Sequence, residues 1–476
     1  MIVNLLESKV PKQVFKVNRE YRTRTKITKR TIAIGQAFGI GVDEEKRFQV
    51  FKDFTFEIKP GDVVLITGDS GSGKSTLLRE VSMQISSTKE PDFAGCKVIE
   101  NNSLSIEDDE PIIQGVGKNV EEAISTLSMA GLNEAFLMLR RFGELSDGQK
   151  YRYRIAKMMD AKRASVWIFD EFAALLDRVT AKVVAYTVQK TARLLGKTLV
   201  VATTHEDLLE DLKPDVLIQK RFGDAVLITR FEKDSFKREC SLLSQVSIEP
   251  CTLDELEGLE KFHYRGKVRA IVKHCFKATL NGEIVSGIVY VCPHLALKGR
   301  NIALPEFRGR SNREMAMKVN KEILRISRVI VIPKYRSIGL GAEIVRRTMP
   351  LVKKKVVETL AVMSKYNPFF ERAGMTRVDV EQDKTELKDL AVLRAIGFRT
   401  ELLPSRNHTE KVVSRLGKKE LEIVKKFALK YCAVAKRRSV ALIPRINLLD
   451  RGAITEALRL YSTRPVYLYW RDPLIN

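Results

Sequence analysis

Short apolar runs separated by amphipathic stretches mark the first half of the chain. The runs fall at Val63–Thr67, Val166–Phe169 and Thr198–Ala202, with helical patterns between them. Buried strands that alternate with helices are typical of an α/β fold with a parallel sheet. The pattern therefore predicts an α/β domain over residues 31–235.

A second mixed pattern follows an expected linker at residues 232–245. It opens with a strand at Val246–Ile248 and a helix at Thr252–Leu256. It continues with a hairpin over Ala278–Val291, in which the Asn281-Gly282 pair favours a tight turn. The pattern predicts a second, smaller α/β domain.

The two ends of the chain hold most of its excess positive charge. The formal net charge is +24; residues 1–30 hold 9 Lys/Arg against 2 acids, and residues 381–476 hold 20 against 11. We expect a basic arm or exposed strand at 1–30, the second domain at 246–380, and a basic, mainly helical region at 381–476. Basic ends favour a polyanionic partner, most often nucleic acid. Solubility alone is the alternative explanation.

Composition narrows the class of protein. With 476 residues, 44% of them hydrophobic, the chain is long and apolar enough for two or three globular domains. No run of about 18 apolar residues occurs, so we expect neither a membrane-spanning helix nor a membrane partner. The N-terminal stretch lacks a secretory pattern. Six scattered cysteines fit a reducing cytoplasm.

A glycine-rich turn follows the first apolar run and opens a helix at Thr76. Its residues match G-x-x-x-x-G-K-[ST] and are Gly68, Asp69, Ser70, Gly71, Ser72, Gly73, Lys74 and Ser75. The glycines let backbone N–H groups surround phosphates, Lys74 reaches the β and γ oxygens, and Ser75 holds Mg²⁺. The turn predicts ATP with Mg²⁺ as the ligand.

Further motifs follow this phosphate loop in a fixed order. They are Gln114, Leu145-Ser146-Asp147-Gly148-Gln149, Asp170-Glu171 at the end of an apolar strand, Ala174-Leu175-Leu176-Asp177, and His205. In this order they resemble the glutamine loop, signature, Walker B acids, D-loop and switch histidine of the ABC-type ATPases, over residues 31–235. Asp147 departs from the family, which has glycine there, and we expect it to slow turnover or alter the closed state.

The resemblance implies roles in metal binding and catalysis. Ser75, Gln114 and Asp170 would bind Mg²⁺, and Gln114 would also contact the nucleotide. Glu171 would polarise the attacking water, and His205 would act as the switch histidine.

The chain carries one phosphate loop and one signature. In this family the two motifs pair between two units, so the resemblance implies a homodimer that encloses two ATP molecules. Ser146, Gly148 and Gln149 would then contact the nucleotide held by the other copy. Phe38 or Phe48 would stack on adenine.

A second glycine-rich turn lies in the second domain. The apolar strand Val329–Ile332 leads into an R-x-x-G-x-G turn and then a helix, and Asn367–Met375 follows about 30 residues later. N–H groups at such a turn and helix N-terminus face an anion. Together these segments resemble the GNAT acyltransferases over residues 246–380.

This resemblance implies an acyl-CoA site with acetyl-CoA as the cofactor. Its contacts would come from Ile330, Ile332, Arg336, Gly339, Gly341, Ala342 and Asn367. Phe370 stands where the family often has a tyrosine that protonates the CoA thiolate. The remaining candidates for this acid are Tyr335, Ser364 and Tyr366.

The pair His263-Tyr264 precedes the expected hairpin. It resembles the Mom-type branch, which modifies the adenine amino group in phage DNA, and His263 would serve as general base. An exposed pair without a catalytic part is the alternative. His274-Cys275 and Cys292-Pro293-His294 offer zinc-compatible ligands, although buried strand cysteines explain them better.

The whole chain resembles archaeal-type fusions of a soluble ABC-type ATPase with a GNAT acyltransferase. The resemblance, with the basic ends, favours ATP-coupled N-acylation of a base amine in RNA, most simply tRNA. One alternative is a protein N-acetyltransferase. Another is a non-enzymatic, ATP-driven remodeller of nucleic acid that uses the GNAT fold as a binding module.

Overall fold

The computed structural model describes residues 13–42, 45–89, 93–232, 236, 239–262, 268, 270–308, 313–380, 384–435, 440–459 and 465–475. The chain divides into two compact units. The first comprises Met1–Val291 and Ser327–Val352, and the second Cys292–Ile326 and Lys353–Asn476. In the described residues no helix is both long and apolar enough to cross a membrane.

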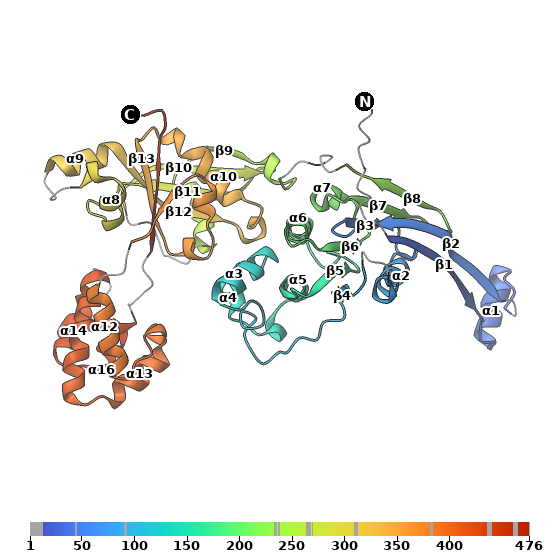
Figure 1. Cartoon of the computed structure of the whole chain (residues 1–476), viewed down its shortest axis with the longest axis horizontal. Coiled ribbons are helices and arrows are strands. Elements are labelled where there is room, and N and C mark those ends of the chain that lie inside the picture. Colours follow the sequence, from blue (N-terminus) through green and yellow to red (C-terminus); the bar gives the residue numbers. More distant parts are fainter. Residues whose placement is uncertain are drawn as a thin grey trace, which may run out of the picture. The chain divides into compact units, whose positions relative to one another are not determined.

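A six-stranded sheet organises the N-terminal part of the first unit (Figure 1). Its strand order is β4-β5-β6-β3-β7-β8, with β8 antiparallel to β7 and the others parallel. The strands are β3 (Val63–Thr67), β4 (Lys97–Glu100), β5 (Ala164–Phe169), β6 (Thr198–Ala202), β7 (Val216–Lys220) and β8 (Val226–Arg230). The α/β fold predicted for this region is confirmed.

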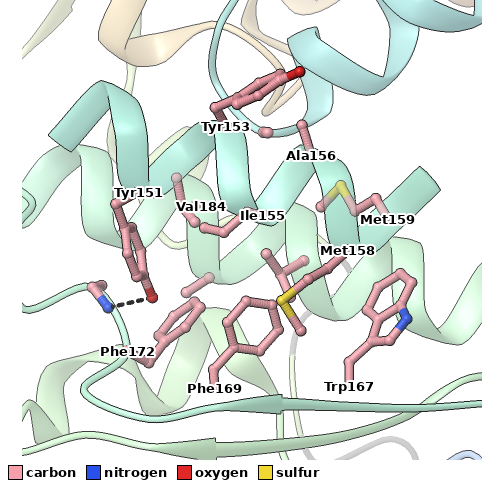
Figure 2. Close-up of a cluster of buried hydrophobic side chains, with 14 of the residues drawn as sticks. Tyr151, Tyr153, Ile155, Ala156, Met158, Met159, Trp167, Phe169, Phe172 and Val184 are labelled. Atoms are coloured by element: carbon pink, nitrogen blue, oxygen red, sulfur yellow. Dashed lines mark hydrogen bonds between the residues drawn. The ribbon is translucent and has the colours of Figure 1, made fainter. Parts of the chain in front are cut away.

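Helices follow and separate these strands. They are α2 (Lys74–Ser87), α3 (Val120–Met129), α4 (Ala135–Met138), α5 (Asp147–Asp160), α6 (Arg178–Leu194) and α7 (Leu209–Leu212). Helix α5 buries Tyr151, Ile155 and Met158 at helical spacing. Figure 2 shows these side chains against Phe169 and Phe172. This core fixes α5 over the end of β5.

An antiparallel hairpin carries the basic N-terminal segment. Strand β1 (Gln13–Thr23) pairs with β2 (Lys46–Ile58), and α1 (Lys29–Phe38) lies between them in sequence. Phe15 and Val17 are buried in the same core as Val64. Strand β1 agrees with the exposed-strand alternative at residues 18–23, whereas its residues Phe15 and Val17 contribute to this core.

The remainder of the first unit is a second mixed α/β segment. It contains β9 (Ser247–Pro250), the 3-10 helix η4 (Asp254–Phe262), β10 (Val272–Leu280), β11 (Glu283–Val291), the end of β12 (Ile323–Val331), η6 (Pro333–Tyr335) and α10 (Leu340–Thr348). Asn281 and Gly282 join β10 to β11 with φ of 50° and 81°. The hairpin agrees with the Asn-Gly expectation. In place of the helix expected at Thr252–Leu256, the structure has a 3-10 helix that begins at Asp254.

The second unit begins with α8 (Lys298–Ala303) and α9 (Arg313–Glu322), and its other strands lie on one side of β12. The strands are β13 (Val356–Ala361), β14 (Thr376–Val378) and β15 (Val466–Arg471). Strand β13 runs parallel to β12, and β15 runs antiparallel between β13 and β14. Since β12 also lies beside β11, the strand order is β14-β15-β13-β12-β11-β10-β9.

A helical bundle interrupts the second unit between β14 and β15. Its helices are α12 (Lys384–Ala395), α13 (Arg406–Arg415), α14 (Lys418–Ala435), α15 (Ile443–Asn447) and α16 (Arg451–Leu458), around a shared apolar core. The chain then returns to the sheet as β15, where Tyr467 donates a 3.0 Å hydrogen bond to the buried Glu358 carboxylate. The region expected to be helical therefore ends in a strand.

Candidate functional site

The loop between β3 and α2 has a backbone that only glycine tolerates at two positions. Gly68 and Gly73 have φ of 139° and 106°. An added Cβ at Gly68 would lie 1.8 Å from the Lys220 carbonyl oxygen, and one at Gly73 would lie 2.5 Å from Val50 Cγ1. Both the left-handed backbone and the close neighbours therefore require glycine in this loop.

Two polar groups of this loop fit a phosphate ligand. The Ser72 side chain is buried, and its Oγ is without a hydrogen-bond partner among the described residues. Lys74 Nζ donates to the carbonyl oxygens of Gly68 at 2.8 Å and Asp69 at 2.6 Å. Burial lowers the Lys74 pKa, and nearby Asp69, Asp170 and Glu171 oppose this shift. An orphaned hydroxyl and a cation along one glycine cradle suit phosphate oxygens.

The Ser75 hydroxyl lies against Asp170 at the end of β5. Ser75 Oγ donates a 3.0 Å hydrogen bond to Asp170 Oδ1. Mg²⁺ prefers oxygen ligands of this kind, together with oxygens of a bound phosphate. The structure thus brings together two of the three predicted metal ligands.

Asn101, just after β4, was not found from the sequence. Its side chain is buried; Oδ1 accepts from Asp170 N at 3.1 Å, and Nδ2 donates to Asp170 O at 3.3 Å. Its sequence neighbourhood holds no motif, so only the fold reveals this role.

The signature segment forms the start of α5. Ser146 is the N-cap, and its backbone N–H donates to Gln149 Oε1 at 3.0 Å. Gly148 lies against the D-loop, since an added Cβ would meet Leu175 O at 3.3 Å. Ser146 and Asp147 are exposed. A capped, exposed helix N-terminus can receive an anion, and the Asp147 carboxylate would weaken that attraction.

The remaining predicted nucleotide contacts are dispersed. Gln114 is exposed in a turn, and among the described residues no hydrogen bond links its side chain to Ser75 or Asp170. His205 follows β6; burial lowers its pKa, and Arg178 adds to this shift. Phe38 and Phe48 are 72% and 52% exposed.

Tyr21, on β1, is an aromatic neighbour of the phosphate loop that sequence reasoning missed. Its hydroxyl lies 3.1 Å from Thr76 Oγ1. In the hairpin, Tyr21 is the register partner of Phe48. The proximity of Tyr21 to Thr76 arises from the hairpin register, which no local pattern predicted.

The second glycine-rich turn uses Arg336 differently from the prediction. Its guanidinium donates to backbone oxygens, with Nε 2.9 Å from Val331 O and Nη1 3.0 Å from Asn133 O. Ser337, with φ of 73°, donates from Oγ to Ser128 O at 2.6 Å. Gly339 has φ of 100° and precedes α10. The turn has the expected shape, but the arginine already satisfies carbonyls of its own unit.

The backbone groups of Ile330 and Ile332, predicted to contact pantetheine, already form hydrogen bonds within the protein. Ile332 N donates to Val285 O at 3.0 Å, and Ile330 O accepts from Ser286 Oγ at 2.8 Å. These two groups face β11, so they are not open to a cofactor at the opposite edge. Because side chains and peptide groups alternate along a strand, the neighbouring residues face the other edge.

The candidate acids are split between the two units. Tyr335 is buried and belongs to the first unit. The same unit holds the glycine-rich turn with Arg336, Gly339, Gly341 and Ala342. Ser364, Tyr366 and Asn367 belong to the second unit. Ser364 Oγ is buried without a partner among the described residues. His263 and Tyr264 lie outside the described residues.

Among the described side chains, no group of three or more His, Cys, Asp or Glu residues is placed to hold a metal ion. His274 and Cys275 lie on β10, opposite β11. Cys251, Cys275 and Cys292 are free thiols.

Part of this chain is similar to known proteins. A solved ATP-binding cassette, in a dimeric post-hydrolysis state with ADP and phosphate, is 20% identical, covers 47% of this chain and 99% of its own, and has a TM-score of 0.35. A family model described as ABC transporter matches residues 51–174.

Curated relatives extend this match. The cytochrome c biogenesis ATP-binding export protein CcmA of Agrobacterium fabrum is 30% identical over 201 residues, which are 36% of this chain and 89% of that protein. CcmA of Brucella abortus is 30% identical over 176 residues, 33% of this chain and 78% of that protein. The chain therefore belongs to the ATP-binding cassette (ABC) family and is an ABC-type ATPase.

Proposed function

We propose that this ATPase couples ATP hydrolysis to the transfer of an acyl group, most simply acetyl, from acyl-CoA to a base amine in nucleic acid. RNA, and tRNA first, is the proposed acceptor. The strand–turn–helix from β12 through Gly339 into α10 carries this proposal, because it offers a turn and a helix N-terminus to a pyrophosphate.

In the nucleotide half, the chain's own groups bind and orient ATP. Lys74 and the N–H groups of the glycine loop hold the phosphates, and Ser75 with Asp170 would hold Mg²⁺. The metal, when bound, neutralises charge that develops on the phosphates. Glu171 is exposed beside Asp170 and would orient the attacking water.

The exposed Ser146 at the N-terminus of α5 supports a homodimer. One chain has a single signature and a single phosphate loop. A second copy would bring its signature to the γ-phosphate, so closure would depend on ATP.

In the transferase half, an acceptor amine attacks the thioester carbonyl. The new C–N bond forms, the C–S bond breaks, the amine proton passes to a base, and the CoA thiolate takes up a proton. His263 is the proposed base. Tyr335, Ser364 and Tyr366 remain the proposed acids.

The charge of the helical bundle supports a nucleic-acid acceptor. Exposed basic side chains on α13 and α14 include Lys411, Arg415, Lys418, Lys419 and Lys426. If about six phosphates are neutralised, log affinity falls with log salt at a slope of about −4 to −5. An unpaired RNA base avoids the flipping cost of about a few kcal/mol in duplex DNA.

The test supplies labelled acetyl-CoA and ATP with tRNA, duplex DNA and a basic protein as competing acceptors. We expect label in tRNA, and none with the Gly341→Asp variant, whose carboxylate repels the pyrophosphate. Label in protein alone, with a shallow salt slope for tRNA, would favour a protein acetyltransferase. If no acceptor is labelled, the result would favour a non-enzymatic, ATP-driven remodeller of nucleic acid.

A further inference from the structure

The turn that follows β5 carries unusual backbone strain. Glu171 and Ala173 have φ of 50° and 61°, although neither is glycine. Each such residue costs roughly 1–3 kcal/mol, and the conformation persists only where surrounding contacts enforce it. The contacts around this turn therefore determine where Glu171 lies.

Residues at the ends of β4 and β6 form hydrogen bonds with the backbone of this turn. Asn101, after β4, bonds both backbone groups of Asp170. At the end of β6, Ala202 O accepts from Phe172 N at 2.8 Å, and Thr203 Oγ1 donates to Phe172 O at 3.0 Å. These bonds fix the backbone on both sides of Glu171.

The last anchor comes from the signature helix. The Tyr151 hydroxyl on α5 accepts a 3.0 Å hydrogen bond from Ala173 N, as Figure 2 shows. Tyr151 is buried, and its ring meets Phe172 edge-on with centroids 6.5 Å apart. Burial raises the pKa of Tyr151, so the hydroxyl stays protonated.

This bond joins two parts of the nucleotide machinery within one chain. Tyr151 lies one turn after Ser146, Asp147 and Gly148 at the start of α5. Ala173 lies two residues after Glu171 and directly before the D-loop. A displacement of α5 would therefore pull on the strained turn through the Tyr151 hydroxyl.

We propose that Tyr151 is a positioning residue that ties the signature helix to the turn of Glu171. The inference rests on the proposed role of Glu171. The hydroxyl holds Ala173 N in place, so Glu171 keeps its orientation toward the attacking water. Removing the hydroxyl leaves a buried N–H unsatisfied beside a strained residue, and the turn relaxes.

The test compares Tyr151→Phe with Tyr153→Phe in the full chain. Both changes delete one hydroxyl from a largely buried tyrosine of α5, but the Tyr153 hydroxyl lies toward Gly115, where an added Cβ would meet it at 2.0 Å. Single-turnover ATP hydrolysis, ATP affinity by calorimetry and thermal stability are measured for each. We expect Tyr151→Phe to slow hydrolysis roughly 10- to 100-fold, since small misplacements of catalytic groups have effects of this size, with ATP affinity within about twofold.

The control variant should keep its hydrolysis rate. An unchanged rate in Tyr151→Phe would overturn the proposal. So would equal losses of rate in both variants that follow their losses of stability, because the role would then be structural. Glu171→Gln is measured in parallel: if it hydrolyses ATP normally, the role of Glu171 fails, whatever Tyr151→Phe does.

Discussion

Two glycine-rich turns in this chain share a strand–turn–helix shape but differ in their readiness for an anion. At the first, Gly68 and Gly73 are held by close contacts, and the buried Ser72 hydroxyl has no partner among the described residues. At the second, the Arg336 guanidinium is taken by backbone oxygens of Val331 and Asn133. A sequence motif reports the path of the backbone, whereas side-chain availability depends on what packs around it.

The two cations differ for the same reason. Lys74 bonds two carbonyls of its own loop, which phosphate oxygens can replace at little cost. Arg336 reaches Asn133 and Val331, so moving it would leave carbonyls of separate segments without their donor. We infer that the first turn is organised for phosphate before any ligand binds, and that Arg336 mainly holds the second turn in place.

The largest expected effect is loss of hydrolysis in Glu171→Gln. The amide cannot polarise water, while Ser75, Asp170 and Lys74 still bind ATP with Mg²⁺. We expect hydrolysis to fall roughly 100- to 1000-fold and an ATP-dependent dimer to accumulate. Light scattering with and without ATP measures the mass. A constant mass would contradict pairing of the signature with the phosphate loop of a second copy.

A crossed pair of glycine variants separates the two turns. Gly68→Ala would place a Cβ 1.8 Å from Lys220 O, so we expect ATP affinity to fall about 100-fold or more while acetyl-CoA affinity stays the same. Gly341→Asp should do the reverse. Gly258→Ala, where an added Cβ meets nothing within 4 Å, is the control. Calorimetry with each ligand measures both affinities. If either variant loses both affinities, the two sites are not independent.

Arg336→Ala sharpens the contrast in side-chain role. Its loss leaves the Val331 and Asn133 carbonyls without their donor, so we expect the free energy of unfolding to fall by about 2 kcal/mol. Arg347→Ala, on the exposed face of α10, should change it by less than about 0.5 kcal/mol. Denaturant titration compares them. If both variants are equally stable and only Arg336→Ala loses acetyl-CoA affinity, Arg336 binds the pyrophosphate and does not mainly hold the turn.

The smallest expected effect is a difference in pH dependence. Burial lowers the Lys74 pKa, so its charge is lost as pH rises through a value below the ordinary one, and ATP affinity should decline there. Arginine keeps its charge throughout this range, so acetyl-CoA affinity should stay level. Glu171→Gln removes an anion that raises the Lys74 pKa, and should move the decline to lower pH. Calorimetry between about pH 7 and 10 measures both curves.

Local pattern predicted the parts of the fold that are buried on both faces. Val63–Thr67 and Thr198–Ala202 are buried throughout, so each gives a continuous apolar run. The pairing of β1 with β2 and the insertion of β15 between β13 and β14 depend on residues far apart in sequence. Neither leaves a local signal that distinguishes it from an exposed strand or a tail.

The site divides in the same way. Motif spacing placed Lys74, Ser75 and Asp170 together because the loops after the parallel strands β3 and β5, which flank β6, meet at one sheet edge. Asn101 and Tyr151 belong to no motif, and their roles arise from tertiary hydrogen bonds. For the same reason, sequence could not reveal that Arg336 is engaged by Asn133, a residue about 200 positions away.

The most direct test titrates one preparation of the full chain with ATP and Mg²⁺ and, separately, with acetyl-CoA. The account predicts that both ligands bind, that Gly68→Ala removes only the first and Gly341→Asp only the second, and that Arg336→Ala weakens neither as much as its glycine neighbour does. Binding of ATP with no detectable binding of acetyl-CoA in any variant would contradict a second anion site in this chain.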